Sequence, residues 1–155
     1  MTRRFEGGTA LATGTSRGIG MAIARQLVFD GARVVVTGRN QKAIDRAVAE
    51  LGGIDHAVGV AWPRRRCRPP GRDGQAWDRQ LRQRRRPAGA VVKTRFAAAR
   101  CEGREDEVAE AYLLKRLGAP QDIGSVVAFQ LSGEAAWVAA QLLVVDGGPL
   151  LTGGL

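Results

Sequence analysis

Apolar runs alternate with helical apolar stripes along the first 61 residues. The run Thr9–Thr13 (TALAT) is short and apolar, and a glycine turn follows it, which is typical of a buried strand. From residue 18 to residue 30, apolar residues recur at the spacing of a helix that packs on one face. They are Ile19, Ile23, Ala24, Leu27 and Val28. Gly31 follows at the position of a left-handed C-cap, so the pattern predicts a strand and then a helix.

The same alternation continues to residue 61. Arg33–Thr37 (RVVVT) is a continuous β-branched run, which favours a strand of a parallel sheet over a half-exposed strand. Asn40 is a plausible N-cap for a helix that Gly52 closes. His56–Ala61 (HAVGVA) then predicts a third strand. Strand, helix, strand, helix and strand joined by short loops predict an α/β fold with right-handed crossovers and a parallel sheet.

The patterning stops at Trp62. Residues 62–86 hold ten arginines and two aspartates, so this segment carries +8 of the net charge of +9. It has almost no aliphatic side chains, and so charged a segment cannot bury enough apolar surface to fold. We therefore predict that this Arg/Pro-rich insert is disordered. The expected organisation is a single truncated domain over 1–155, made of an N-terminal cofactor-binding half (1–61), a disordered basic segment (62–90) and a C-terminal part (91–155).

Ordinary patterning returns near Val91. A helix is expected over about 105–114, and a second helix follows with Pro120 in its first turn. Its apolar stripe is Ile123, Val127 and Leu131. Gln141–Val145 (QLLVV) predicts a final strand, which Asp146 and two glycines end.

Composition excludes several classes of protein. No apolar run reaches the roughly 18 residues of a membrane span, and no apolar stretch follows Arg3 and Arg4 as in a secretory signal. Cys67 and Cys101 have no metal-ligand or redox spacing, and His56 is the single histidine. We therefore expect a cytoplasmic protein with reduced thiols, no metal site and no membrane partner.

A glycine-rich turn is the strongest chemical signal. Residues 13–20 read TGTSRGIG and lie between a predicted strand and a predicted helix, which is the context that a phosphate-binding turn needs. Gly14 permits the tight turn, Gly18 lets a pyrophosphate approach the backbone, and Gly20 allows close packing of the helix. The helix N-terminus offers free N–H groups and partial positive charge. The candidate residues here are Gly14, Ser16, Arg17, Gly18, Ile19 and Gly20.

This spacing, Thr-Gly-x-x-x-Gly-Ile-Gly, resembles the fingerprint of the short-chain dehydrogenase/reductase family. VVVTGRN (34–40) is similar to the family's second strand and cofactor-selecting loop, and residues 115–148 are similar to its C-terminal helix, last strand and terminal loop. VVKTRFA (91–97) is similar to the segment after its sixth strand, which implies that Thr94 contacts the nicotinamide end of the cofactor. The resemblance implies a Rossmann-type doubly wound parallel sheet. It also implies an oxidoreductase of the carbonyl reductase or alcohol dehydrogenase type, acting on a small carbonyl or alcohol.

Charge indicates which nicotinamide cofactor is bound. Enzymes that use NAD place an acidic residue at the end of the second strand, where it binds the ribose hydroxyls. This chain has Gly38 there, followed by Arg39 and Asn40, and Arg17 lies in the glycine turn. Two guanidinium groups favour a 2′-phosphate, so we expect NADP(H). Alternatively, Arg17 and Arg39 are solvated surface residues.

The family's catalytic residues are not found in this sequence. The resemblance calls for a tyrosine, a lysine four residues later and an upstream serine. The single tyrosine, Tyr112, has Arg116 four residues on and Lys115 three residues on, and an arginine does not shuttle protons. The serines are Ser16, Ser125 and Ser132. We therefore assign no catalytic residue, interpret Tyr112 as an ordinary helix residue, and expect a catalytically defective remnant.

The resemblance implies that a middle stretch of the family's fold is missing from this chain, and this gap has structural consequences. In the family's sheet order, 3-2-1-4-5-6-7, strands four and five and most of strand six are missing. The strand predicted at 141–145 then has no neighbour unless it pairs with the first strand, and unpaired buried backbone groups are costly. The helices of the family's main oligomer interface fall in the same gap, so that oligomer is not expected. Residues 62–90 have the composition of an out-of-frame reading of GC-rich DNA, a hypothesis that reading the other two frames tests.

Two other functions fit parts of the sequence. A working enzyme of the same family could use unconventional groups. A nucleic-acid-binding protein could use residues 62–86, where Trp62 and Trp77 stand among arginines. Such binding would be independent of sequence and strongly sensitive to salt, so specific nucleic-acid recognition is not expected.

Overall fold

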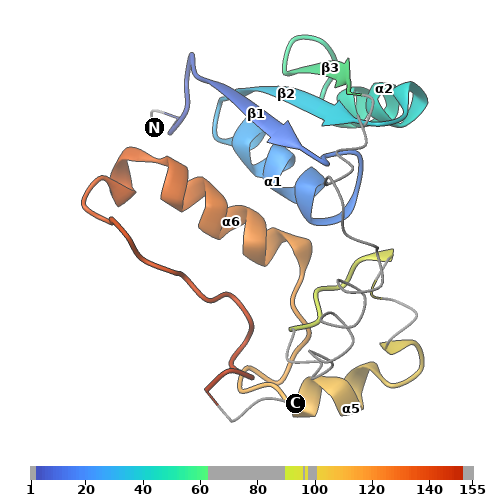
Figure 1. Cartoon of the computed structure of the whole chain (residues 1–155), viewed down its shortest axis with the longest axis vertical. Coiled ribbons are helices and arrows are strands. Elements are labelled where there is room, and N and C mark those ends of the chain that lie inside the picture. The colour runs from blue at the N-terminus through green and yellow to red at the C-terminus, as the bar shows by residue number, and fades with distance from the viewer. Residues whose placement is uncertain (1–2, 63–89, 96, 98–100, 152–155) are drawn as a thin grey trace, which may run out of the picture.

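The computed structural model describes residues 3–62, 90–95, 97 and 101–151. Two groups of elements are visible in Figure 1, an N-terminal α/β layer and a C-terminal part built around one long helix. The elements are β1 (Thr9–Thr13), α1 (Gly18–Phe29), β2 (Arg33–Gly38), α2 (Gln41–Glu50), β3 (Ala57–Ala61), α5 (Glu105–Glu110), α6 (Pro120–Leu131) and the 3₁₀ helix η1 (Gly133–Ala135).

The described sheet has three parallel strands in the order β1-β2-β3. Leu11 lies opposite Val35, and Val35 lies opposite Val58. The continuous valine run of β2 suits the central strand of the described sheet, because a strand with neighbours on both sides and helices packed on it is buried. The side chains of Val34 and Val36 are fully buried. The predicted alternation of strands and helices over residues 9–61 is therefore confirmed.

Helix α6 runs alongside α1 (Figure 1), and small residues make this close packing possible. A Cβ atom on Gly124 would lie 3.1 Å from the carbonyl oxygen of Ala22, so a larger residue would push the helices apart. Ala128 is fully buried on the same side. The predicted stripe of Ile123, Val127 and Leu131 is thus not the buried face. Ile123 and Val127 are half-buried and Leu131 is exposed, because the small residues bring the two backbones together.

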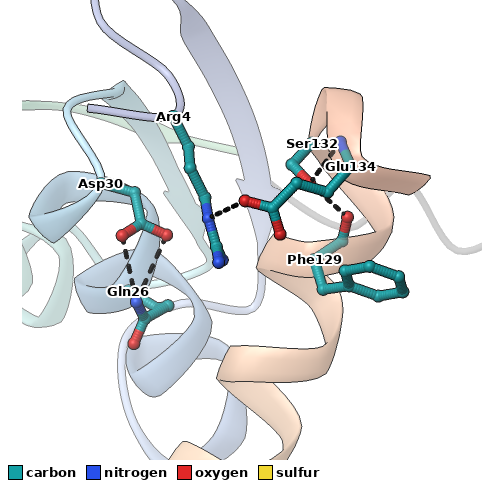
Figure 2. Close-up of polar contacts among 6 residues, drawn as sticks. All are labelled: Arg4, Gln26, Asp30, Phe129, Ser132 and Glu134. Carbon is teal, nitrogen blue, oxygen red and sulfur yellow. Dashed lines mark hydrogen bonds and ion pairs between the residues drawn. The ribbon is translucent and has the colours of Figure 1, made fainter. Parts of the chain in front are cut away.

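Polar contacts fix the C-terminal end of α6 (Figure 2). Ser132 Oγ donates to the Phe129 carbonyl over 2.7 Å and accepts from the Glu134 N–H over 3.2 Å. Glu134 also pairs with Arg4, with 3.0 Å between Nε and Oε1. Since Arg4 comes shortly before β1, this ion pair joins the end of α6 to the segment that leads into the sheet.

A second apolar cluster lies in the C-terminal part and consists of the buried residues Cys101, Tyr112 and Leu117. Helix α5 ends at Glu110, four residues before the predicted end. The chain turns there, and Lys115 adopts a left-handed φ of 52°. The prediction of a helix reaching residue 114, with Tyr112 inside it, was wrong because the turn carries Tyr112 into this cluster.

The predicted strand Gln141–Val145 is not formed. The segment forms neither a helix nor a strand and is exposed, with Leu142 90% and Val144 53% accessible, and it pairs with no described strand. A strand needs a neighbour for its N–H and C=O groups, and sequence pattern alone cannot supply one. The basic segment predicted to be disordered lies outside the described residues, apart from its two ends. No helix in the described parts of the chain is long and apolar enough to cross a membrane.

The start of α6 depends on Asp122. Its carboxylate accepts from the Ala119 N–H over 2.7 Å and forms two hydrogen bonds with Arg116. Hydrogen bonding from Arg116, and then from the Ala119 backbone, lowers the pKa of Asp122 below its ordinary value of 3.8. The charged carboxylate is therefore the form that stabilises the fold.

Asp122→Ala is expected to lower the free energy of unfolding by about 1 kcal/mol at pH 7, because the helix loses an acceptor for an N-terminal N–H. Since the folded-state pKa of Asp122 is lowered, its stabilisation is present above pH 3.8 and is lost as pH falls below that value. Chemical unfolding of both proteins between pH 7 and pH 3 measures this. Asp122→Asn, which keeps an acceptor oxygen, should lose less, and a difference that does not change with pH would contradict the assignment.

Candidate functional site

The glycine turn between β1 and α1 has the backbone conformation that its sequence predicted. Gly14 has a φ of 69° and Gly18 a φ of 61°, both in the left-handed region that favours glycine. A Cβ atom added to Gly14 would meet no atom within 4 Å, so the space above the turn is open. A bulky anion can therefore approach the backbone at this point.

Two contacts hold the turn in shape. A Cβ atom on Gly20 would lie 2.5 Å from the carbonyl oxygen of Gly14, so only glycine lets α1 begin this close to the turn. Thr15 is buried, and its hydroxyl donates to the carbonyl of Ala12 over 3.3 Å. Sequence reasoning missed Thr15, although a hydroxyl residue directly inside a turn that follows a buried strand is a signal for such a contact.

The N-terminus of α1 is open to an anion. Arg17 is its N-cap residue and makes no side-chain cap bond, and the first turn of the helix holds no acidic residue. The first N–H bonded back along this helix is that of Met21, which reaches the Arg17 carbonyl over 3.5 Å. The N–H groups of Gly18, Ile19 and Gly20 precede it, and together they present partial positive charge. Ser16, half-buried in the turn, lies beside them.

The structure brings Thr94 to this turn from the C-terminal part. A Cβ atom on Gly18 would lie 3.6 Å from the methyl carbon of Thr94. Thr94 is held by its own hydroxyl, which accepts from the Ala97 N–H over 3.3 Å, and by the neighbouring bridge between Val92 and Gly118. Gly18 and Thr94, two sequence-predicted site residues that stand far apart in the chain, are therefore close together in space.

The second basic position follows β2. Because Thr13 pairs with Thr37, the carboxyl ends of β1 and β2 lie side by side, and Arg39 comes just after that edge. Arg39 is exposed, as is Arg17. Asn40 caps α2, with its Oδ1 accepting from the Ala43 N–H over 3.1 Å, so its predicted cap role is confirmed. Arg39 and Asn40 thus follow the carboxyl end of β2, next to the carboxyl end of β1 from which the glycine turn with Arg17 leads.

The side chain of Tyr112 is packed in the second apolar cluster. Its side chain is 1% exposed, and its hydroxyl accepts from the Val91 N–H over 2.5 Å. Lys115 Nζ binds the carbonyl and the carboxylate of Glu110, and Arg116 pairs with Asp122. Neither basic neighbour bonds to the Tyr112 hydroxyl in the described structure, so the arrangement does not form a proton relay.

No group of three or more histidine, cysteine or acidic side chains that could hold a metal ion occurs in the parts of the chain that the structure describes. Cys101 is a buried free thiol. The basic segment on which the nucleic-acid alternative depends, residues 62–86, lies outside the described residues after Trp62.

Two family models match the chain in separate segments. The model described as short chain dehydrogenase matches residues 8–62. The model described as Enoyl-(Acyl carrier protein) reductase matches residues 88–149. The two matches lie on either side of the basic segment and together cover more than half of the chain.

Two individual relatives match a short stretch of this chain. Dehydrogenase/reductase SDR family member 4 of Caenorhabditis elegans is 46% identical over 61 residues, which is 38% of this chain and 24% of the relative. The NADP-dependent (R)-specific alcohol dehydrogenase of Lentilactobacillus kefiri is 46% identical over 55 residues, or 36% of this chain and 22% of the relative. These matches span about a quarter of each relative's length.

A third relative matches nearly the whole chain, at lower identity. Dehydrogenase/reductase SDR family member 4 of Mus musculus is 27% identical over 250 positions, spanning 96% of this chain and 90% of the relative. Because the chain has 155 residues, many of those positions have no counterpart in it.

Solved structures share the architecture. A gluconate dehydrogenase candidate from Agrobacterium tumefaciens has a TM-score of 0.73 at 17% identity, covering 95% of this chain and 97% of that one. A short-chain dehydrogenase/reductase from Brucella melitensis has a TM-score of 0.66 at 18% identity, covering 90% and 95%. The parallel sheet with its helices is therefore a Rossmann-like fold.

Proposed function

Since the chain belongs to the short-chain dehydrogenase/reductase family, we propose that its glycine turn binds NADP(H) and that the chain is a catalytically defective remnant of a carbonyl reductase or alcohol dehydrogenase. One observation carries the cofactor half of this proposal. The turn leaves open space over Gly14 and an uncapped helix N-terminus, with Thr94 against Gly18. A phosphate group fits there because the backbone offers donors and no described atom lies within 4 Å of a Cβ position on Gly14.

Each part of the cofactor has a candidate partner in this chain. The N–H groups of Gly18, Ile19 and Gly20 would hold the pyrophosphate, with Ser16 at the side of the turn. Arg17, Arg39 and Asn40 would surround the adenosine ribose. Thr94 would contact the nicotinamide end. When bound, NADPH supplies the hydride that a carbonyl reduction needs.

The preference for the 2′-phosphate rests on Arg39 and Arg17. Both are exposed basic residues, and Gly38 leaves no acidic group at the end of β2. A Cβ atom on Gly38 would lie 3.2 Å from Ile44 Cγ1, so a side chain at this position would crowd α2. Guanidinium groups form charge-assisted hydrogen bonds to phosphate, so the edge of β2 favours NADPH over NADH.

Arg39→Ala is expected to weaken NADPH binding about tenfold or more, because a hydrogen bond to a charged group contributes about 1.5–3 kcal/mol. NADH binding should change little, since NADH has no 2′-phosphate. Calorimetric titration of both cofactors measures the preference. Arg33→Ala is the matched control, because it removes an equal charge from the other end of β2. Equal affinities of the unaltered protein for the two cofactors would overturn the proposed selectivity.

The proposed loss of turnover rests on Tyr112, whose hydroxyl already takes part in a hydrogen bond. Reduction of a ketone leaves an alkoxide that an acid must protonate, and general acid catalysis contributes about 10²–10⁴-fold. Tyr112 is the one tyrosine of the sequence, and its hydroxyl is bound to the Val91 N–H inside the second apolar cluster. The mouse relative aligns over 250 positions although this chain has 155 residues, and the two family matches stop at residue 62 and resume at residue 88; both support the view that a piece of the fold, with its catalytic helix, is missing.

A further inference from the structure

Strand β1 forms one edge of the described sheet. It pairs with β2 along one side, and no described residue pairs with its other side. Leu11, in the middle of the strand, is 70% exposed. An edge like this offers a row of N–H and C=O groups to any extended chain that reaches it.

A groove of about 460 Å³ runs along the same edge. Its floor comes from β1 and its wall from α1 and α6. The apolar residues that matter here are Ala10, Ala12, Ile23, Leu27, Val127 and Leu131. A chain that pairs with β1 would place every second side chain in this groove, so the groove selects a strand with apolar residues at alternate positions.

The same molecule exposes a segment of that kind. Gln141–Val145 has five residues, as β1 has, and carries no charge. Leu142 and Val144 are two residues apart and exposed, so they would occupy the groove together, while Leu143 would lie beside Leu11 on the other face.

The segment of the same chain does not reach β1 in this structure. The Arg4–Glu134 pair holds the end of α6 near the segment that leads into β1. In Figure 1 the chain then leaves α6 on the side away from the sheet, with α6 between it and β1. Its far end is anchored near the second apolar cluster, where the Leu114 N–H donates to the Gly147 carbonyl over 3.2 Å.

We propose that two copies of this chain form a dimer in which residues 141–145 of each copy pair with the other copy's β1, along the edge that no described residue occupies. The exchange is reciprocal, so it satisfies both exposed edges and closes without further growth. This dimer does not use the helices of the family's main oligomer interface, which the resemblance places in the missing stretch. The proposal does not depend on cofactor binding.

Light scattering coupled to size exclusion tests the dimer with the full chain. We expect twice the 16.5 kDa mass of one chain. Leu143→Pro removes a strand N–H donor from an exposed segment and should give the single-chain mass, as should Leu11→Lys, which places a charge on the edge strand. The matched control Ala139→Pro lies in the same stretch outside residues 141–145 and should stay dimeric. An unaltered chain with the mass of one copy overturns the proposal.

Disulfide formation identifies the paired segments. All variants carry Cys67→Ser, since the remaining Cys101 is buried. An oxidised mixture of the Leu11→Cys and Leu143→Cys proteins should give a linked pair that contains one of each. Linkage in the Leu11→Cys protein alone would show pairing of two β1 strands, and linkage in the Leu143→Cys protein alone would show pairing of two 141–145 segments. Either result, or no linkage in the mixture, contradicts the exchange.

Discussion

Gly20→Ala is expected to destabilise the protein by about 1–3 kcal/mol and to abolish most of its NADPH binding. The new Cβ atom would lie 2.5 Å from the Gly14 carbonyl oxygen and 3.2 Å from the Thr15 Cα atom. These are backbone atoms, so the turn or the start of α1 has to move, and overpacking of this kind costs about 1–3 kcal/mol. The higher helix propensity of alanine recovers at most about 1 kcal/mol. Denaturant unfolding and cofactor titration measure the two effects.

Gly133→Ala is the control for this substitution. A Cβ atom at Gly133 would meet nothing within 4 Å, and Gly133 has no positive φ. It should therefore leave both stability and NADPH binding nearly unchanged. If Gly20→Ala bound NADPH as tightly as the unaltered chain, the turn would not be the phosphate site.

No carbonyl reduction is expected with NADPH and a panel of ketones, diketones and aldehydes. Tyr112, the one tyrosine of the sequence, is held in the second apolar cluster with its hydroxyl bonded to Val91. Without a donor and without groups that orient the carbonyl, the reaction loses several orders of magnitude in rate. The loss of NADPH absorbance should stay at the rate without substrate.

Tyr112→Phe separates packing from catalysis. The substitution leaves the Val91 N–H without its acceptor, so stability should fall by about 1–3 kcal/mol. NADPH consumption should be the same as in the unaltered chain. Robust consumption that disappears in Tyr112→Phe would mean that the chain rebuilt its active site and is a working enzyme.

The N-terminal half of the fold could be predicted because its signals are local. The valine run of β2 and the cap at Asn40 are read from a few adjacent residues, and the structure has both. The segment 141–145 has an equally clear strand pattern, but a strand exists only when another strand accepts its backbone. That partner is a property of the whole fold, and the described residues do not supply one.

The residues of the candidate site also divide into those that local signals predict and those that they do not. Glycine spacing predicted that Gly20 allows close packing of the helix, and the structure places a Gly20 Cβ position 2.5 Å from the Gly14 carbonyl oxygen. This prediction was possible because the packing constraint lies among neighbouring residues. Thr94 was assigned to the cofactor site only through the family resemblance, and its place beside Gly18 was not predicted, since no local rule brings these residues together. The place of Tyr112 could not be predicted, because a turn after α5, not the helix pattern, decides where its side chain lies.

Thermal unfolding of the full chain with and without NADPH tests the central claim most directly, since a ligand that binds only the folded state raises its stability. We expect a melting temperature that rises with NADPH concentration, and rises less at the same concentrations of NADH. A melting temperature that stays constant up to millimolar NADPH would contradict cofactor binding at the glycine turn, and with it the proposed function.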